Sequence, residues 1–217
     1  MHEVRKLSDA EKWFKLHRAE IAVKGLIKHG FQAYYIPDRQ KAVQAIMDLV
    51  PPEATISFGS SETLAQLGIL DHLSTVGNQL TLNPQDKGNA RLSGRRKGLT
   101  ADCFLTSVNA MTMDGRLVNI DATGNRIASM VFGPQKVIIV AGVNKIVENL
   151  DAAIARARNV AAVTNAKKLG VNVPCLKMGR CIDCDSPERI CKITVILDRC
   201  PTSTLIHVLV VGEDLGY

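Results

Sequence analysis

The chain has 217 residues, of which 46% are hydrophobic and 22% are charged, and its formal net charge is +6. This balance is typical of a globular protein and excludes a disordered chain. No apolar run approaches the roughly 20 residues that cross a bilayer, and residues 1–6 begin no apolar signal-peptide core. The expected location is therefore cytoplasmic.

Apolar positions at helical spacing predict a first helix over residues 8–30, capped by Ser8 and stopped by Gly30. Strands and helices then alternate along the chain. We expect a strand at 31–36, a helix at 41–49, a strand at 54–58, a helix at 61–73, strands at 101–108, 116–120 and 136–141, a helix at 146–169, and strands at 193–197 and 205–211. This order predicts an α/β fold with a mainly parallel sheet flanked by helices.

The character of the sequence changes after Gly170. Five of the six cysteines fall between residues 175 and 200, among turn-forming residues. We therefore expect an α/β core at residues 1–170 and a cysteine-bearing segment at residues 171–217. Because the second segment is too short to build a core of its own, it is expected to pack on the main sheet.

A Gly/Ser turn follows the strand predicted at 54–58. It offers Gly59, Ser60, Ser61 and Thr63 as ligand-binding residues, because glycine lets a backbone approach a ligand and hydroxyls and free amides attract anions. The alternative is a helix that starts after a tight turn and needs only Ser60 or Ser61 as its cap.

A second group of polar residues lies near the ends of the strands predicted at 101–108 and 116–120. Asp114-Gly115 is explained by a hairpin turn. The remaining polar residues predict a cleft for a small anionic ligand, in which Asp121 orients ligand hydroxyls and Arg126 neutralises the anion. The candidates are Asn109, Asn119, Asp121, Thr123, Gly124, Asn125 and Arg126.

Several ordered segments resemble the lactate-utilisation (LUD) family: the Gly59–Thr63 turn, the runs at 101–126 and 133–147, and the closing residues 211–217. The resemblance implies the fold shared with ribose-5-phosphate isomerases and CoA transferases, with a cleft at the carboxyl ends of the strands. It also implies an association with lactate oxidation, because some members belong to a complex that oxidises lactate to pyruvate with iron–sulfur clusters. No catalytic residue is carried over from the family.

The clustered cysteines predict a metal site made by Cys175, Cys181, Cys184 and Cys191. Cysteine thiolates bind iron–sulfur clusters and structural zinc alike, so the spacing does not separate the two. The redox association of the family favours a 4Fe-4S cluster, with zinc as the alternative. Cys200 could replace Cys175 as a ligand, whereas Cys103 is expected in the core.

Three functions stay open. The first is a LUD-like redox protein that binds a small carboxylate or phosphorylated ligand. The second is an isomerase- or transferase-like enzyme with structural zinc, in which Glu62, Asp102 or Asp121 would be the base or nucleophile. The third is a non-enzymatic subunit of an iron–sulfur oxidoreductase, and a homo-oligomer is also open.

The basic run at 91–97 is either a solvated surface loop or a source of cations for an anionic ligand. It has no interleaved aromatic residues for base stacking, so nucleic acid is not an expected partner.

Overall fold

The computed structural model describes residues 7–83 and 85–217 of the chain. Residues 1–6, for which the sequence analysis expected no signal-peptide core, lie outside the described part. The centre of the molecule is a six-stranded sheet in the order β1-β10-β7-β4-β2-β3, and every pair in it is parallel. Its strands are β1 (Gln32–Ile36), β2 (Thr55–Phe58), β3 (Gln79–Leu80), β4 (Cys103–Thr106), β7 (Lys136–Gly142) and β10 (Leu205–Val211). The prediction of an α/β fold with a mainly parallel sheet is confirmed.

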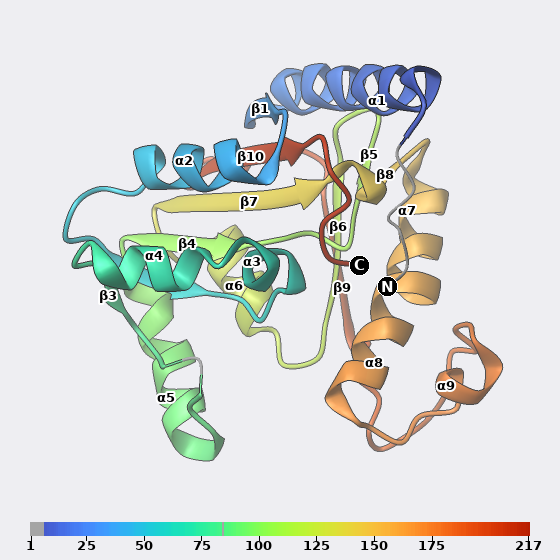
Figure 1. The fold of residues 1–217 in the computed structure, drawn as a ribbon. Helices are drawn as coiled ribbons and strands as arrows, with labels where there is room; N and C mark the ends of the chain where they lie inside the picture. Colours follow the sequence, from blue (N-terminus) through green and yellow to red (C-terminus); the bar gives the residue numbers. More distant parts are fainter. Residues whose placement is uncertain (1–6, 84) are drawn as a thin grey trace, which may run out of the picture.

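Both faces of this sheet are covered (Figure 1), as a parallel sheet requires. One face packs against α1 (Asp9–Lys28) and α6 (Asn125–Val131), and the other packs against α2 (Arg39–Leu49), α3 (Glu62–Leu67) and α4 (Ile69–Thr75). All residues of β7 except Lys136 are buried, because the strand lies in the middle of the sheet between β10 and β4.

A second, four-stranded sheet has the order β8-β5-β6-β9. It consists of β5 (Ala110–Thr112), β6 (Leu117–Asp121), β8 (Ile146–Val147) and β9 (Ile193–Leu197). The predicted hairpin at Asp114-Gly115 joins β5 to β6, which are antiparallel. The helix α7 (Leu150–Arg156) packs against this sheet and continues through a π-helical stretch, Ala157–Ala162, into α8 (Val163–Leu169).

The first predicted helix is confirmed as α1, and Ser8 forms a capping box with Glu11. Two other predicted helices differ from the structure. The helix expected at 61–73 is divided into α3 and α4 by Gly68, which adopts a left-handed conformation. The helix expected from residue 146 begins only at Leu150, because residues 146–147 pair with β5 as strand β8.

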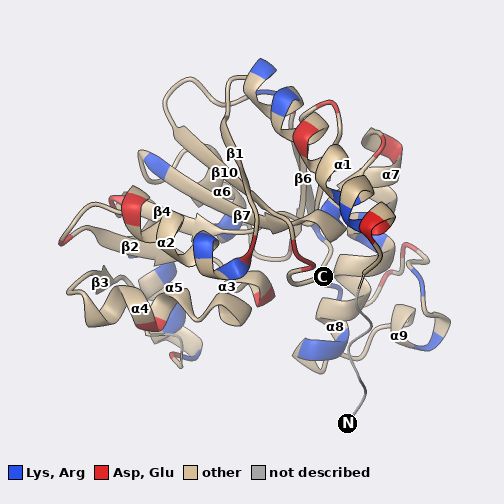
Figure 2. Ribbon diagram, turned by 45° about the horizontal axis from the view of Figure 1, so that its top comes forward, with Lys and Arg blue, Asp and Glu red and all other residues tan. Residues whose placement is uncertain are grey.

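The basic run at 91–97 lies in a helix, α5 (Gly88–Lys97), which the sequence analysis did not predict and which extends away from the sheet (Figure 1). Lys, Arg, Asp and Glu are distributed over many elements (Figure 2). In residues 7–83 and 85–217, no helix is both long and apolar enough to cross a membrane.

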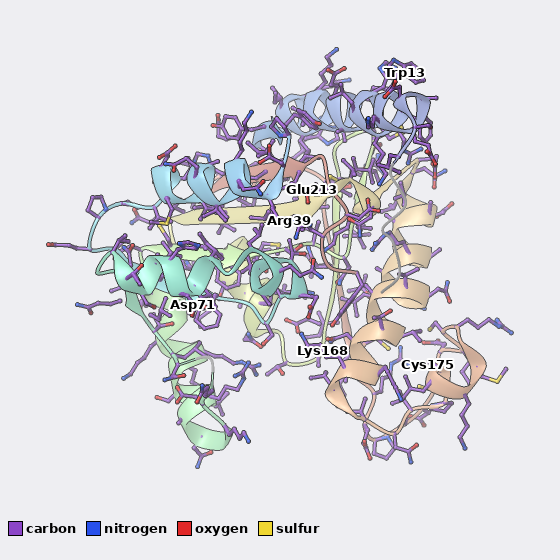
Figure 3. All side chains as sticks on the ribbon, in the orientation of Figure 1. Trp13, Arg39, Asp71, Lys168, Cys175 and Glu213 are labelled. Atoms are coloured by element: carbon purple, nitrogen blue, oxygen red, sulfur yellow. The ribbon has the colours of Figure 1, made fainter. Side chains whose placement is uncertain are left out.

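The cysteine-bearing segment contributes a strand to each sheet. After the short helix α9 (Cys175–Met178) and a loop, β9 pairs with β6, and β10 lies between β1 and β7. The residues after β10 run back over the sheet, where Glu213 pairs with Arg39 at the start of α2 at 2.6 Å (Figure 3). The segment predicted to pack on the core therefore supplies one of its central strands.

Candidate functional site

A cavity of about 230 Å³ lies where four parallel strands end. Ser60 follows β2, Ser107 follows β4, Lys145 follows β7 and Tyr217 follows β10, and all four residues line the cavity. We call this cavity the cleft. Its place at the carboxyl ends of parallel strands is the usual one for ligand sites in α/β folds.

The Gly/Ser turn reaches the cleft through Ser60 and Ser61 but not through Gly59 or Thr63. The hydroxyl of Ser61 accepts a hydrogen bond from the N–H of Leu64 and so caps α3, as the simpler interpretation of the turn required. Because α3 has only six residues, its first turn alone does not define an anion site.

Gly59 faces Arg126 rather than a ligand. A Cβ atom at this position would lie 3.0 Å from Thr106 Oγ1 and 3.2 Å from Arg126 Cδ. Glycine at this position therefore lets the arginine stem approach the strand end without a displacement of Thr106 or Arg126.

Arg126 is the most heavily bonded side chain of the site. Its guanidinium group donates to the side-chain oxygens of Asn109 and Asn119, each at 3.1 Å, and to the carbonyl oxygens of Ser107 and Ile120. Burial lowers the pKa of Arg126, and nearby Asp121 acts in the opposite direction. These bonds hold the ends of β4 and β6 together, so the arginine builds the wall of the cleft and adds positive charge to it.

The other predicted residues of this region divide into two groups. Asp121, Thr123 and Asn125 line the cleft together with Asn109 and Arg126. Asn119 is completely buried behind them, and Gly124 precedes α6 outside the lining. The carboxylate of Asp121 accepts backbone N–H groups of Ala122 and Arg126, at 2.8 and 3.2 Å.

Lys145 is a site residue that the sequence analysis missed. It is 2% exposed, and its Nζ atom lies 2.9 Å from both Thr63 Oγ1 and Ser107 Oγ. Burial, then the nearby positive charges of Arg156 and Arg126, lower its pKa to about 7. The available signal was a lysine three residues after an almost wholly apolar strand.

Arg95 and Glu62 bring further charges to the cleft. Arg95 comes from α5, is half-buried and makes no hydrogen bond or ion pair with another described residue. Burial lowers its pKa, as does nearby Arg91. Glu62 is ion-paired with Lys168 of α8, which points from its helix toward the centre of the molecule (Figure 3). Among the described residues that line the cleft, Arg95 is therefore the arginine whose donors are available to a ligand.

The four predicted metal ligands line one small cavity beside α8, which we call the cysteine cavity. Cys175, Cys181, Cys184 and Cys191 are all half-buried free thiols, and Cys175 lies at the start of α9, beside α8 (Figure 3). Burial and then the other three cysteines raise the pKa of Cys175. Among the described residues, no group of three His, Cys, Asp or Glu side chains is placed to hold a metal ion.

Backbone and arginine contacts shape the cysteine cavity. The N–H of Asp183 donates to Cys181 Sγ at 3.4 Å, and Arg189 donates to the carbonyl oxygens of Cys184 and Cys191. Cys200 lies elsewhere: it donates to the carbonyl of Thr204 and does not line the cavity. Cys103 is buried in β4, in the core where it was expected.

The cleft and the cysteine cavity have a common wall. Ala162, from the π-helical stretch, and Ile190, from the loop before β9, line both of them. The two parts of the molecule that sequence analysis selected separately are therefore neighbours in space.

The chain is similar over nearly its whole length to a solved structure. A crystal structure of a DUF162 family protein from Deinococcus radiodurans matches with a TM-score of 0.52 and 15% sequence identity, over 95% of this chain and 99% of that chain. At this identity the likeness concerns the fold. No protein with curated annotation matches the sequence. The sequence profile of the LUD domain matches residues 19–211, which include both strands of the cysteine-bearing segment, and the chain therefore belongs to the LUD domain family.

Proposed function

We propose that this protein is a redox member of the LUD family, which binds a small carboxylate or phosphorylated ligand in the cleft and holds an iron–sulfur cluster with Cys175, Cys181, Cys184 and Cys191. The observation that carries the proposal is the wall shared by the cleft and the cysteine cavity at Ala162 and Ile190. A ligand in the cleft and a cluster at the cysteines would lie on either side of these two residues, an arrangement that suits electron exchange.

The charges of the cleft support an anionic ligand. Arg95 lines the cleft and has no hydrogen-bond partner within residues 7–83 and 85–217, and Arg126 and Lys145 add positive charge from the wall. The two carboxylates are already engaged, Glu62 by Lys168 and Asp121 by backbone N–H groups. A volume of about 230 Å³ suits a ligand of a few non-hydrogen atoms, since pockets for larger molecules begin at about 300 Å³.

The four cysteines supply the donor set of a cluster, but among the described residues they are not gathered closely enough to hold a metal ion, and the cavity of about 20 Å³ would have to widen around a cluster. The four cysteines line one cavity whose other lining includes the apolar Ala166, Val173 and Ile182. The guanidinium groups of Arg158 and Arg189, which also line it, would offset the negative charge of four thiolates. The hydrogen bond from the N–H of Asp183 to Cys181 Sγ is of the kind that tunes the potential of a bound cluster. When bound, such a cluster supplies one-electron transfer.

Anaerobic purification, followed by a visible absorption spectrum and analysis of iron, sulfide and zinc, tests the cysteine part. We expect iron and sulfide in nearly equal amounts and a broad brown absorbance that is lost in Cys184→Ser. Cys200→Ser is the matched control and should keep the absorbance, because Cys200 lies outside the cysteine cavity. Zinc without a visible band would instead favour an isomerase- or transferase-like enzyme with a structural metal, and no metal would refute the site.

Calorimetric titration with lactate, pyruvate and inorganic phosphate tests the cleft. We expect one of these anions to bind and Arg95→Gln to weaken it about tenfold, the loss of one charged hydrogen bond. Arg96→Gln removes the neighbouring exposed cation, which does not line the cleft, and should bind as the unchanged protein does. If no anion binds, the ligand part of the proposal is wrong, and a non-enzymatic subunit becomes the better description.

A further inference from the structure

Resting on the anionic ligand proposed above, we infer that Lys145 is the reactive group of the cleft: its amine forms a Schiff base with the carbonyl carbon of a bound 2-oxo acid. The inference begins from position. Lys145 ends the short 3-10 helix Val143–Lys145, which directly follows β7. It lines the cleft between Ser107, which follows β4, and Thr63 in the first turn of α3.

The hydrogen bonds around Nζ match a neutral amine. A neutral amine has two N–H donors and one lone pair, whereas an ammonium group has three donors. Two acceptors are present, Thr63 Oγ1 and Ser107 Oγ, each at 2.9 Å. In the neutral form both N–H groups are engaged by these two oxygens, and the lone pair that attacks a carbonyl carbon is left over.

The charges around Lys145 favour the same neutral form. Burial and the positive charges of Arg156 and Arg126 bring its pKa to about 7, so about half of the molecules carry the free amine near neutrality. A lysine that is desolvated or close to another cation is the usual activated amine of Schiff-base chemistry. The other charged or titratable groups that line the cleft are Glu62, Arg95, Asp121 and Tyr217.

The arginines select the kind of carbonyl compound. A 2-oxo acid has a carboxylate next to its carbonyl group, and Arg95 offers unengaged donors to that carboxylate. Ser107 and Thr63 are placed to move the protons. The reaction balances without an oxidant: the amine nitrogen bonds to the carbonyl carbon, one N–H proton passes to the carbonyl oxygen through a hydroxyl, and the resulting hydroxyl group leaves as water with the second N–H proton.

Reductive trapping on the full chain tests this inference. The protein is incubated with pyruvate and cyanoborohydride and digested, and the reduced adduct is located by peptide mass spectrometry. We expect at least about tenfold more adduct on Lys145 than on Lys168, although the side chain of Lys168 is 52% exposed and that of Lys145 is buried. The contrast arises because the ion pair with Glu62 raises the pKa of Lys168. Adduct formation should also increase as the pH rises through about 7.

Two variants and a binding measurement complete the test. Lys145→Arg should lose the adduct, whereas Lys136→Arg should keep it, because Lys136 lies at the opposite end of β7 and donates to the carbonyl of Leu49. Adducts distributed according to exposure, or no adduct at all, would overturn the inference. If pyruvate binds but forms no adduct, only the role of Lys145 is refuted. If pyruvate neither binds nor forms an adduct, the result also counts against the proposed carboxylate ligand.

Discussion

Arg95 and Arg126 have different roles although both are arginines of the cleft. Arg126 is bound by four protein acceptors, whereas Arg95 has no such partner among the described residues. Arg126→Met leaves buried acceptors without donors, and we expect it to lower the free energy of unfolding by about 3 kcal/mol. Arg95→Met should change stability by no more than about 0.5 kcal/mol. Urea unfolding of the two variants measures both free energies of unfolding. Equal decreases in the two variants would contradict the different roles assigned to Arg126 and Arg95.

His207 should make the stability of the protein depend on pH. The imidazole is buried in β10, neither ring nitrogen has a hydrogen-bond partner among the described residues, and its pKa is lowered by burial and then by Lys136. The unfolded chain therefore binds a proton more readily than the folded one, so stability is complete above a pH of about 6.5 and falls as the pH is lowered through that value.

Substitution of His207 checks this dependence. His207→Phe retains a ring to stack on Tyr34, whose centroid lies 6.1 Å from that of His207, and it should flatten the decrease in stability between about pH 7 and 5. Urea midpoints across this range measure the effect. His72→Gln, at an exposed position on α4, is the control and should keep the decrease. An unchanged slope in His207→Phe would assign the pH dependence to other groups.

The sequence indicated part of the cleft at the level of residues. Ser60 was selected from the Gly/Ser turn, and Asp121 and Asn125 were selected from the polar residues near strand ends. All three line the cleft. Lys145 was missed because most of its environment comes from segments distant in sequence, namely Thr63 of α3, Ser107 after β4 and Arg126 of α6. The bonds of Arg126 were equally invisible, since local sequence does not show how many acceptors a folded chain brings to one guanidinium group.

Gly68 determines where α3 ends and α4 begins. Its φ of 62° lies in the left-handed region, and no atom lies within 4 Å of an added Cβ. A substitution therefore adds backbone strain without a steric clash. Gly68→Ala should lower the free energy of unfolding by about 1 kcal/mol, and Gly68→Asn should lower it less because asparagine tolerates this conformation better. Thermal unfolding measures both variants. A more stable Gly68→Ala would show that one continuous helix is also accessible.

At the level of elements, the order of helices and strands was predictable but not all of their lengths. The buried strand at 136–141 was recognised from its apolar composition, and it is the central strand β7. The pairing of residues 146–147 with β5 was not predicted, because a two-residue strand has no periodicity of its own. The helix α5 was missed because its sequence is polar and rich in glycine.

The whole molecule depends on the strand that the cysteine-bearing segment supplies. β10 lies between β1 and β7, and its buried residues pack into both apolar layers, Ile206 and Val210 on one face and Leu209 and Val211 on the other. A chain that ends after residue 170 lacks this strand and also β9, so β1 loses its only paired neighbour among the described strands. We expect residues 1–170 alone to lack the native fold, measured as the loss of hydrogen-exchange protection in β7.

The control for this truncation is the full chain with Cys181→Ser and Cys184→Ser. It retains every strand and should keep slow exchange in β7, because the sheet is held by apolar packing that these two thiols do not enter. Protected β7 amides in the truncated chain would instead establish residues 1–170 as an independent domain. The proposed electron path would then cross a boundary between two units, whereas a shared β10 makes the cleft and the cysteine cavity parts of one cooperative structure.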